Sequence, residues 1–184
     1  MSTWMVVEDE PAIYAVLLSM FELWGIDGIA FVDGESAVNW IDGVDAGLFK
    51  GELPELALID IRLSGKLDGT DVGARLCASP ALNEISIVLI TAYRLSPEQE
   101  REHLARSGAV KVINKPLPSI NELEEEFTNI LKARAALRKT PTSTTATSPP
   151  VPTATNSKLA QKPNIPRKRM THMYKRRSST KKEG

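Results

Sequence analysis

The sequence has few of the features that mark secreted, zinc-binding or membrane proteins. Its single cysteine, Cys77, excludes an intrachain disulfide, and its two histidines have no Cys or His neighbours at metal-ligand spacing. The longest apolar stretches, such as residues 15–18, are far too short to cross a bilayer. The first residues carry acids by position 8 and lack the basic start of a signal peptide. We therefore expect an intracellular, cytoplasmic protein without a membrane span.

A zero net charge hides a strong asymmetry along the chain. Residues 1–139 contain 13 Lys/Arg against 22 Asp/Glu, a net charge of −9, whereas residues 140–184 contain 10 Lys/Arg against one acid, a net charge of +9. Residues 140–157 include ten Ser/Thr and four Pro, a composition with almost nothing apolar to bury. We therefore expect one folded domain over residues 1–138. A disordered linker and basic tail are expected over residues 139–184.

The first 135 residues alternate between short apolar runs and helical patterns. The runs fall at residues 4–7, 29–32, 56–59, 85–90 and 110–113, and the helical patterns begin near residues 11, 35, 70, 97 and 120, the second of them ending at Ile41. Asp33, Thr70 and Ser119 are the expected N-caps, and Asp68-Gly69 is an expected turn. Continuous apolar strands separated by helices predict an α/β fold. Its parallel sheet should be doubly wound, with helices on both faces and right-handed crossovers.

Polar residues follow four of the five expected strands. Glu8 and Asp9 follow the first, Asp60 closes the third, Thr91 closes the fourth, and Lys115 follows the fifth. In an open parallel sheet, ligands bind outside the carboxyl ends of the strands, where the strand order switches. For the strand order 2-1-3-4-5, this switch brings the three acids together.

Three adjacent carboxylates would repel one another unless a cation lies among them, and Mg²⁺ suits such a site. Asp60 could then act as a carboxylate nucleophile toward a phosphoryl donor. Thr91 would supply a hydroxyl donor, and Lys115 a mobile positive charge. Each residue alone is more often a cap, a turn residue or a surface lysine. The five together, on four strand ends, favour the functional interpretation.

These residues lie in four segments that resemble the receiver domain of bacterial two-component response regulators. The segments are Val6–Pro11, Leu58–Leu63, Leu89–Ala92 and Ile113–Pro116. The resemblance extends from about residue 3 to residue 135 and implies a flavodoxin-like fold of the CheY-like type. It implies a phosphoacceptor at Asp60, with Mg²⁺ bound by Asp9, Asp60 and the backbone carbonyl of Arg62, and by Glu8 through water. It also implies a histidine kinase, or a histidine phosphotransfer protein, as the phosphoryl donor.

The sequence departs from that family pattern at three positions. Glu8 stands where many relatives have Asp, which lengthens the side chain by one methylene and alters the water shell of the metal. Ser64 replaces a common Pro. Val112 occupies the position where most relatives carry a Tyr or Phe that rotates on activation. The usual coupling of threonine to an aromatic side chain is therefore not expected at Val112, and Tyr93 is the alternative aromatic.

Three functions are considered for the whole chain. The leading one is a stand-alone receiver that signals by phosphorylation-dependent protein–protein contact and has at most slow autophosphatase activity. The second is a nucleic-acid-binding regulator whose basic tail contacts phosphates; a solvated tail, or one that contacts the acidic domain, is the alternative. The third, an enzyme that forms an aspartyl phosphate, is disfavoured because Arg62 stands where the phosphatases of this type have a general acid.

Overall fold

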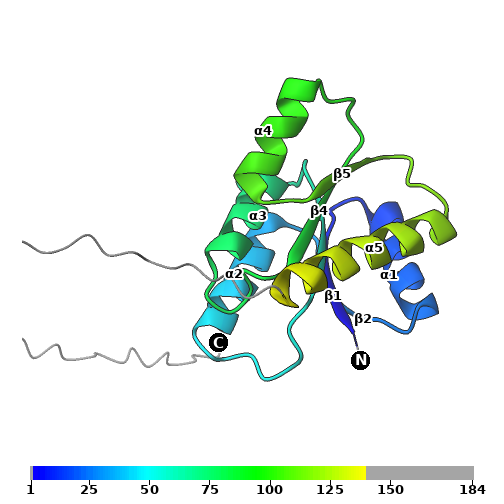
Figure 1. The fold of residues 1–184 in the computed structure, drawn as a ribbon. Helices are drawn as coiled ribbons and strands as arrows, with labels where there is room; N and C mark the ends of the chain where they lie inside the picture. Colours follow the sequence, from blue (N-terminus) through cyan, green and yellow to red (C-terminus); the bar gives the residue numbers. More distant parts are fainter. Residues whose placement is uncertain (1, 140–184) are drawn as a thin grey trace, which may run out of the picture. The chain divides into compact units, whose positions relative to one another are not determined.

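The computed structural model describes residues 2–139, which form five strands and five helices in strict alternation (Figure 1). The predictions for residues 140–184, which concern the linker, the basic tail and the second histidine, His172, lie outside the described residues. The elements are β1 (Thr3–Val7), α1 (Pro11–Leu23), β2 (Asp27–Phe31), α2 (Gly34–Asp45), β3 (Leu56–Asp60), α3 (Gly69–Ala78), β4 (Ser86–Thr91), α4 (Pro97–Ser107), β5 (Lys111–Asn114) and α5 (Ile120–Lys139).

The strands form one parallel sheet in the order β2-β1-β3-β4-β5, which confirms the predicted doubly wound α/β fold. The central strands β1, β3 and β4 are buried along their whole length, as expected for continuous apolar runs covered on both faces. The order switches between β1 and β3, so that the ends of these two strands open the crevice predicted from the sequence.

Alternate residues of each strand face two separate cores. On one face, Met5 and Val7 of β1 pack with α2 and α3; on the other, Trp4 and Val6 pack with α1 and α5. Figure 1 shows α1 and α5 on the right of the sheet and α2 and α3 on the left. The ring of Trp4 makes edge-to-face contacts with rings from both α1 and α5. This packing fixes β1, whose C-terminal end carries the first two acids.

Two of the expected helix caps are confirmed and one is wrong. Asp33 accepts a hydrogen bond from the Ser36 N–H, and Ser119 Oγ accepts one from the Glu122 N–H. Thr70, however, lies inside α3, and the N-cap is Asp68, whose carboxylate accepts from the N–H of Asp71 and the hydroxyl of Thr70. A carboxylate beside a helix N-terminus also gains from the helix dipole, which a hydroxyl does not.

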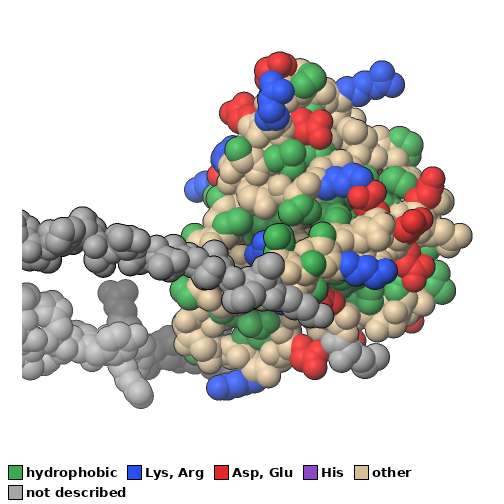
Figure 2. Space-filling model, viewed as in Figure 1, with side chains coloured by type: hydrophobic (Ala, Val, Ile, Leu, Met, Phe, Trp, Pro, Cys, Tyr) green, Lys and Arg blue, Asp and Glu red, His purple; other side chains and the backbone are tan. Residues whose placement is uncertain are grey.

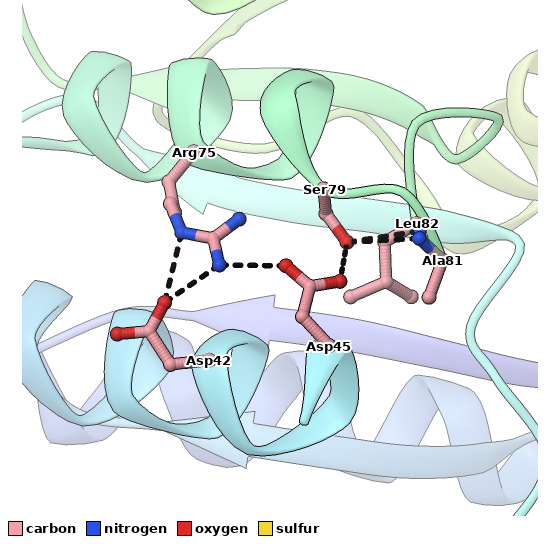
Figure 3. A network of polar contacts seen from close by, with 6 residues as sticks. All are labelled: Asp42, Asp45, Arg75, Ser79, Ala81 and Leu82. Atoms are coloured by element: carbon pink, nitrogen blue, oxygen red, sulfur yellow. Dashed lines mark hydrogen bonds and ion pairs between the residues drawn. The ribbon is translucent and has the colours of Figure 1, made fainter. Parts of the chain in front are cut away.

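Helix α2 is longer than the sequence predicted, because tertiary contacts carry it past Gly43. The helix was expected to end at Ile41 but continues to Asp45, with Val44 buried in the core. Figure 3 shows the charged network that joins its last turn to α3. Arg75 donates to the carboxylates of Asp42 and Asp45, and Asp45 also accepts from the Ser79 hydroxyl.

Helix α4 is attached mainly through its last turn to α3. The two helices touch where Gly73 meets Ser107, and a Cβ on Gly73 would lie only 2.7 Å from the Ser107 Cβ. Arg106 also pairs with Asp68 and Asp71 at the start of α3. Ser107 is the one residue of α4 that is buried. The first turns of α4 therefore stand away from the sheet, at the top of Figure 1.

The described surface mixes charges of both signs. In the space-filling view of Figure 2, acidic side chains gather at the right-hand edge, where α5 begins in Figure 1, while basic and acidic side chains alternate over α4. No helix among residues 2–139 combines the length and apolar character that crossing a membrane requires.

Candidate functional site

All five site residues predicted from the sequence meet at the carboxyl end of the sheet. Glu8 and Asp9 follow β1, Asp60 ends β3, Thr91 ends β4, and Lys115 follows β5. Backbone hydrogen bonds beyond the strands hold these ends in register: the Glu8 N–H donates to the Phe31 carbonyl, and the Lys115 N–H donates to the Thr91 carbonyl at 2.7 Å.

The three carboxylates form the group of acidic side chains that could hold a metal ion. One oxygen from each of Glu8, Asp9 and Asp60 lies within 4.8 Å of the others. Glu8 is fully buried, Asp60 is 5% exposed, and Asp9 is half-buried at the mouth of the crevice. Burying this much negative charge is unfavourable without a cation, and an all-oxygen site with an open side is typical of Mg²⁺.

Lys115 supplies the positive charge that the described residues bring to this cluster. Its ammonium donates a hydrogen bond to Glu8 Oε1 at 3.0 Å, and its Nζ lies 2.8 Å from Glu8 Oε2 and 3.5 Å from Asp60 Oδ1. Burial alone would lower the pKa of Lys115, but the hydrogen bond to Glu8 and the charge of Asp60 outweigh burial and raise it. Lys115 is therefore charged at neutral pH.

The site resists ionisation of Asp60. Burial, followed by the charge of Glu8, raises the pKa of Asp60 from 3.8 to about 6, although Lys115 pulls it in the opposite direction. One lysine therefore does not neutralise the site. A second cation would remove the remaining repulsion and would favour ionised Asp60.

One oxygen of Glu8 is left without a hydrogen bond. Oε1 accepts from Lys115 and from the Glu10 N–H, whereas Oε2, although close to the Lys115 ammonium, lies outside hydrogen-bond geometry and is fully buried. This oxygen is ion-paired with Lys115 but accepts no hydrogen bond, so it could also accept one from a water molecule bound to a metal ion. The residues present therefore fit the predicted Mg²⁺.

Ser64 positions Asp9, a role that the sequence did not reveal. The Ser64 N–H donates to Asp9 Oδ2 at 3.0 Å and so ties the loop after β3 to the loop after β1. Arg62 lies in the same loop, with its guanidinium 5.2 Å from the centre of the Tyr93 ring. The metal-binding role of the Arg62 carbonyl stays a prediction.

The Thr91 hydroxyl at the end of β4 keeps its proton available for donation. The side chain is 1% exposed, and Oγ1 accepts a hydrogen bond from the Tyr93 N–H at 3.1 Å, which leaves the O–H free to donate. Tyr93 is 57% exposed, and Val112 packs against the hydrophobic core on the face of the sheet covered by α2 and α3. The aromatic candidate therefore lies on the surface in this structure.

Gly69 is a second residue whose structural role the sequence did not reveal. A Cβ at this position would lie 2.0 Å from the backbone oxygen of Asp60. The Gly69 N–H donates to the Ile61 carbonyl, so the start of α3 presses directly on the end of β3. The Asp68-Gly69 pair was predicted only as a turn; the close approach could not be seen without the position of β3.

The model of the response regulator receiver domain matches residues 4–128, about two-thirds of the chain. This chain belongs to the response regulator receiver family. Receiver domains accept phosphoryl groups in two-component signalling, bind Mg²⁺ at an acidic site, and interact with histidine kinases or phosphotransfer partners. The family assignment agrees with the acid cluster, the strand order and the position of Asp60 at the end of β3.

A curated relative is the probable transcriptional regulator ycf27 of Porphyridium aerugineum, 31% identical over 128 residues, which are 70% of this chain and 47% of that protein. The chain thus spans about half the length of this relative. Among solved structures, the signal receiver domain of a modulated diguanylate cyclase from Desulfovibrio desulfuricans G20 matches with a TM-score of 0.59 and 27% identity, covering 74% of this chain and 98% of that one.

Two further receiver structures share the fold at lower identity. The CheY-like receiver protein of Methanospirillum hungatei JF-1 has a TM-score of 0.61 and 20% identity, covering 74% of this chain and 98% of that one. The receiver domain of the sensor histidine kinase PA1611 of Pseudomonas aeruginosa PAO1 has a TM-score of 0.58 and 23% identity, covering 71% and 98%. That structure carries a magnesium ion coordinated in its active-site cleft.

Proposed function

We propose that this chain accepts a phosphoryl group on Asp60 from a histidine kinase or a histidine phosphotransfer protein in the cytoplasm. Phosphorylation would then change its contacts with another protein, and the chain itself would be no enzyme beyond slow autodephosphorylation. The observation that carries the proposal is the position of Asp60, with its carboxylate beside two further acids, 3.5 Å from the Lys115 ammonium.

The proposed chemistry divides among the site residues. A carboxylate oxygen of Asp60 forms the new P–O bond while the bond between phosphorus and the donor breaks, and the electron pair leaves with the donor. The Lys115 ammonium pairs with one phosphoryl oxygen, and the Thr91 hydroxyl donates to another.

Mg²⁺, held by Asp9, Asp60 and the Arg62 carbonyl and through water by Glu8, would supply charge neutralisation for Asp60 and the phosphoryl oxygens. The related receiver with magnesium in its cleft supports this cofactor. We infer that the receiver domain occupies residues 1–138 and that residues 139–184 act as a linker and basic tail. The curated relative is named a probable transcriptional regulator, but because this chain spans only about half of it, we do not extend DNA binding to this chain.

The test is acceptance of one phosphoryl group from acetyl phosphate with Mg²⁺, measured by intact mass. Asp60→Asn should abolish the added mass, and Asp27→Asn, an exposed acid on β2, should not. Equal labelling of the wild type and the Asp60→Asn protein would show that the acceptor is another residue.

A further inference from the structure

A basic groove lies between α4 and the loops that follow β3 and β4. It has a volume of about 500 Å³, and its lining includes Arg62, Lys66, Arg94, Tyr93 and His103. Thr91 also lines it, so the groove opens beside the phosphoryl site without including the acid cluster. A volume of this size accommodates several side chains of a bound ligand.

The groove collects the cations of the domain that have no acidic partner. Half of the Lys and Arg side chains of residues 2–138 form ion pairs, such as Arg75, Arg101 and Arg138. Within those residues, the cations whose side chains form neither an ion pair nor a hydrogen bond are Lys50, Arg62, Lys66, Arg94 and Lys132. Three of these five line the groove, although residues 1–139 carry a net charge of −9.

The acids nearest to the groove are already engaged. Asp68, which lines it, caps α3 and pairs with Arg106. Glu35 accepts a hydrogen bond from the Lys66 backbone N–H at 2.7 Å and leaves the Lys66 ammonium without a partner. None of these acids forms an ion pair with Arg62, Lys66 or Arg94.

The groove is also held open by fixed contacts. The pairing of Arg106 with Asp68 and Asp71 anchors the last turn of α4, and the guanidinium of Arg62 stacks on the Tyr93 ring. At Gly65 the backbone has a φ of +112°, which favours glycine and sets the path of the loop that carries Lys66. Because Arg62 is held against Tyr93, its side chain loses less conformational entropy when a ligand binds.

We propose that this basic groove binds an acidic segment of a partner protein, one that presents several Asp or Glu side chains in succession. The cations come from two loops, one on each side of the groove, and so suit spaced carboxylates better than one compact anion. The exposed Tyr93 ring adds the kind of amphipathic contact that protein interfaces favour. The remaining surface of the domain has a net negative charge and repels such a segment. The groove would therefore both attract the segment and fix its orientation on the domain. This binding does not require phosphorylation of Asp60, so it can be tested separately from the proposed function.

The probe is a blocked hexaglutamate peptide, titrated into the full-length protein at low ionic strength. Binding is followed by NMR at the backbone amides of residues 62–68 and 93–99, so that contacts with the basic C-terminal sequence are counted separately. The test variant is the pair Lys66→Glu and Arg94→Glu. Its matched control, with the same net charge, is the pair Lys50→Glu and Lys132→Glu, two exposed and unpaired cations outside the groove.

The expected result is saturable binding at the groove amides, weakened roughly tenfold or more by the groove pair and about twofold or less by the control pair. Equal weakening by both pairs, or no shifts at the groove amides, would overturn the proposal. So would binding of inorganic phosphate or pyrophosphate at these amides without binding of the peptide, because the groove would then serve small anions. If the charge-reversed protein fails to fold, Lys66→Gln with Arg94→Gln must give the same ordering against Lys50→Gln with Lys132→Gln.

Discussion

Asp60→Asn should stabilise the folded protein when Mg²⁺ is absent, although it removes the proposed phosphoacceptor. In the native site, burial and the charge of Glu8 raise the pKa of Asp60 from 3.8 to about 6. Above that pH the folded protein therefore carries an ionised carboxylate in a place that disfavours its charge. Asparagine keeps the shape of the side chain and removes the charge. The substitution should therefore relieve repulsion without leaving a cavity.

The size of the effect follows from the two pKa values. Their difference corresponds to about 3 kcal/mol at most, and screening by water at the open side of the crevice reduces this to roughly 1–2 kcal/mol. Because the native pKa lies above the unfolded one, the native state binds more protons between the two values, and the wild type loses stability as pH rises from about 4 to about 6. The advantage of the variant should be complete above pH 6.5 and absent below pH 3.8.

The assay is urea unfolding with EDTA at several pH values, with Asp27→Asn as the control for a lost surface charge. In a parallel thermal melt at pH 7.5, the melting temperature of Asp60→Asn should be about 3–6 °C above that of the wild type. Millimolar Mg²⁺ should narrow the difference by stabilising the wild type. An unfolding free energy that falls on substitution, or that differs from the wild type by the same amount at pH 3.5 and pH 7.5, would refute the electrostatic reasoning.

Three other predictions concern the metal, a glycine and the C-terminal residues. Mg²⁺ should raise the melting temperature by mass action, and Asp9→Ala should remove most of that increase; a wild-type melting temperature indifferent to millimolar Mg²⁺ would contradict the site. Gly69→Ala should destabilise the fold by several kcal/mol, because its Cβ would meet the Asp60 carbonyl, whereas Gly43→Ala on α2, where a Cβ meets nothing within 4 Å, should stabilise it by about 0.5–1 kcal/mol. Deletion of residues 139–184 should leave folding and phosphorylation of Asp60 intact, as measured by circular dichroism and intact mass; loss of a tight, salt-sensitive affinity for DNA or RNA on deletion would favour the nucleic-acid alternative.

The positions of the site residues could be predicted because each acid directly follows an apolar run. Val7 precedes Glu8, and Ile59 precedes Asp60, so the strand ends are visible in the sequence itself. Parallel strands bring their carboxyl ends to one edge of the sheet, and this topology alone was enough to predict that the acids meet.

What could not be predicted depends on contacts between distant segments. Asp68 and Thr70 are both good N-cap residues, and only the geometry of the loop after β3 decides for Asp68. Helix α2 continues past Gly43 because two contacts stabilise its last turn. Val44 is buried in the core, and Arg75 pairs with Asp42 and Asp45. Similarly, no local pattern predicts that Ser64 positions Asp9.

The placement of Lys115 has a consequence for the order of events at the site. Its ammonium is closer to Glu8 than to Asp60, at 2.8 and 3.5 Å, so in the metal-free protein it mainly balances the buried Glu8. Phosphorylation replaces the single negative charge of the Asp60 carboxylate with about two on the phosphoryl group, in a site that also holds the carboxylates of Glu8 and Asp9 and one ammonium. Lys115 can form ion pairs with the phosphoryl oxygens only if another cation neutralises the charges of Glu8 and Asp9. We therefore expect phosphorylation to require Mg²⁺. Without a second cation, the lysine cannot leave Glu8 without exposing a buried, unpaired carboxylate.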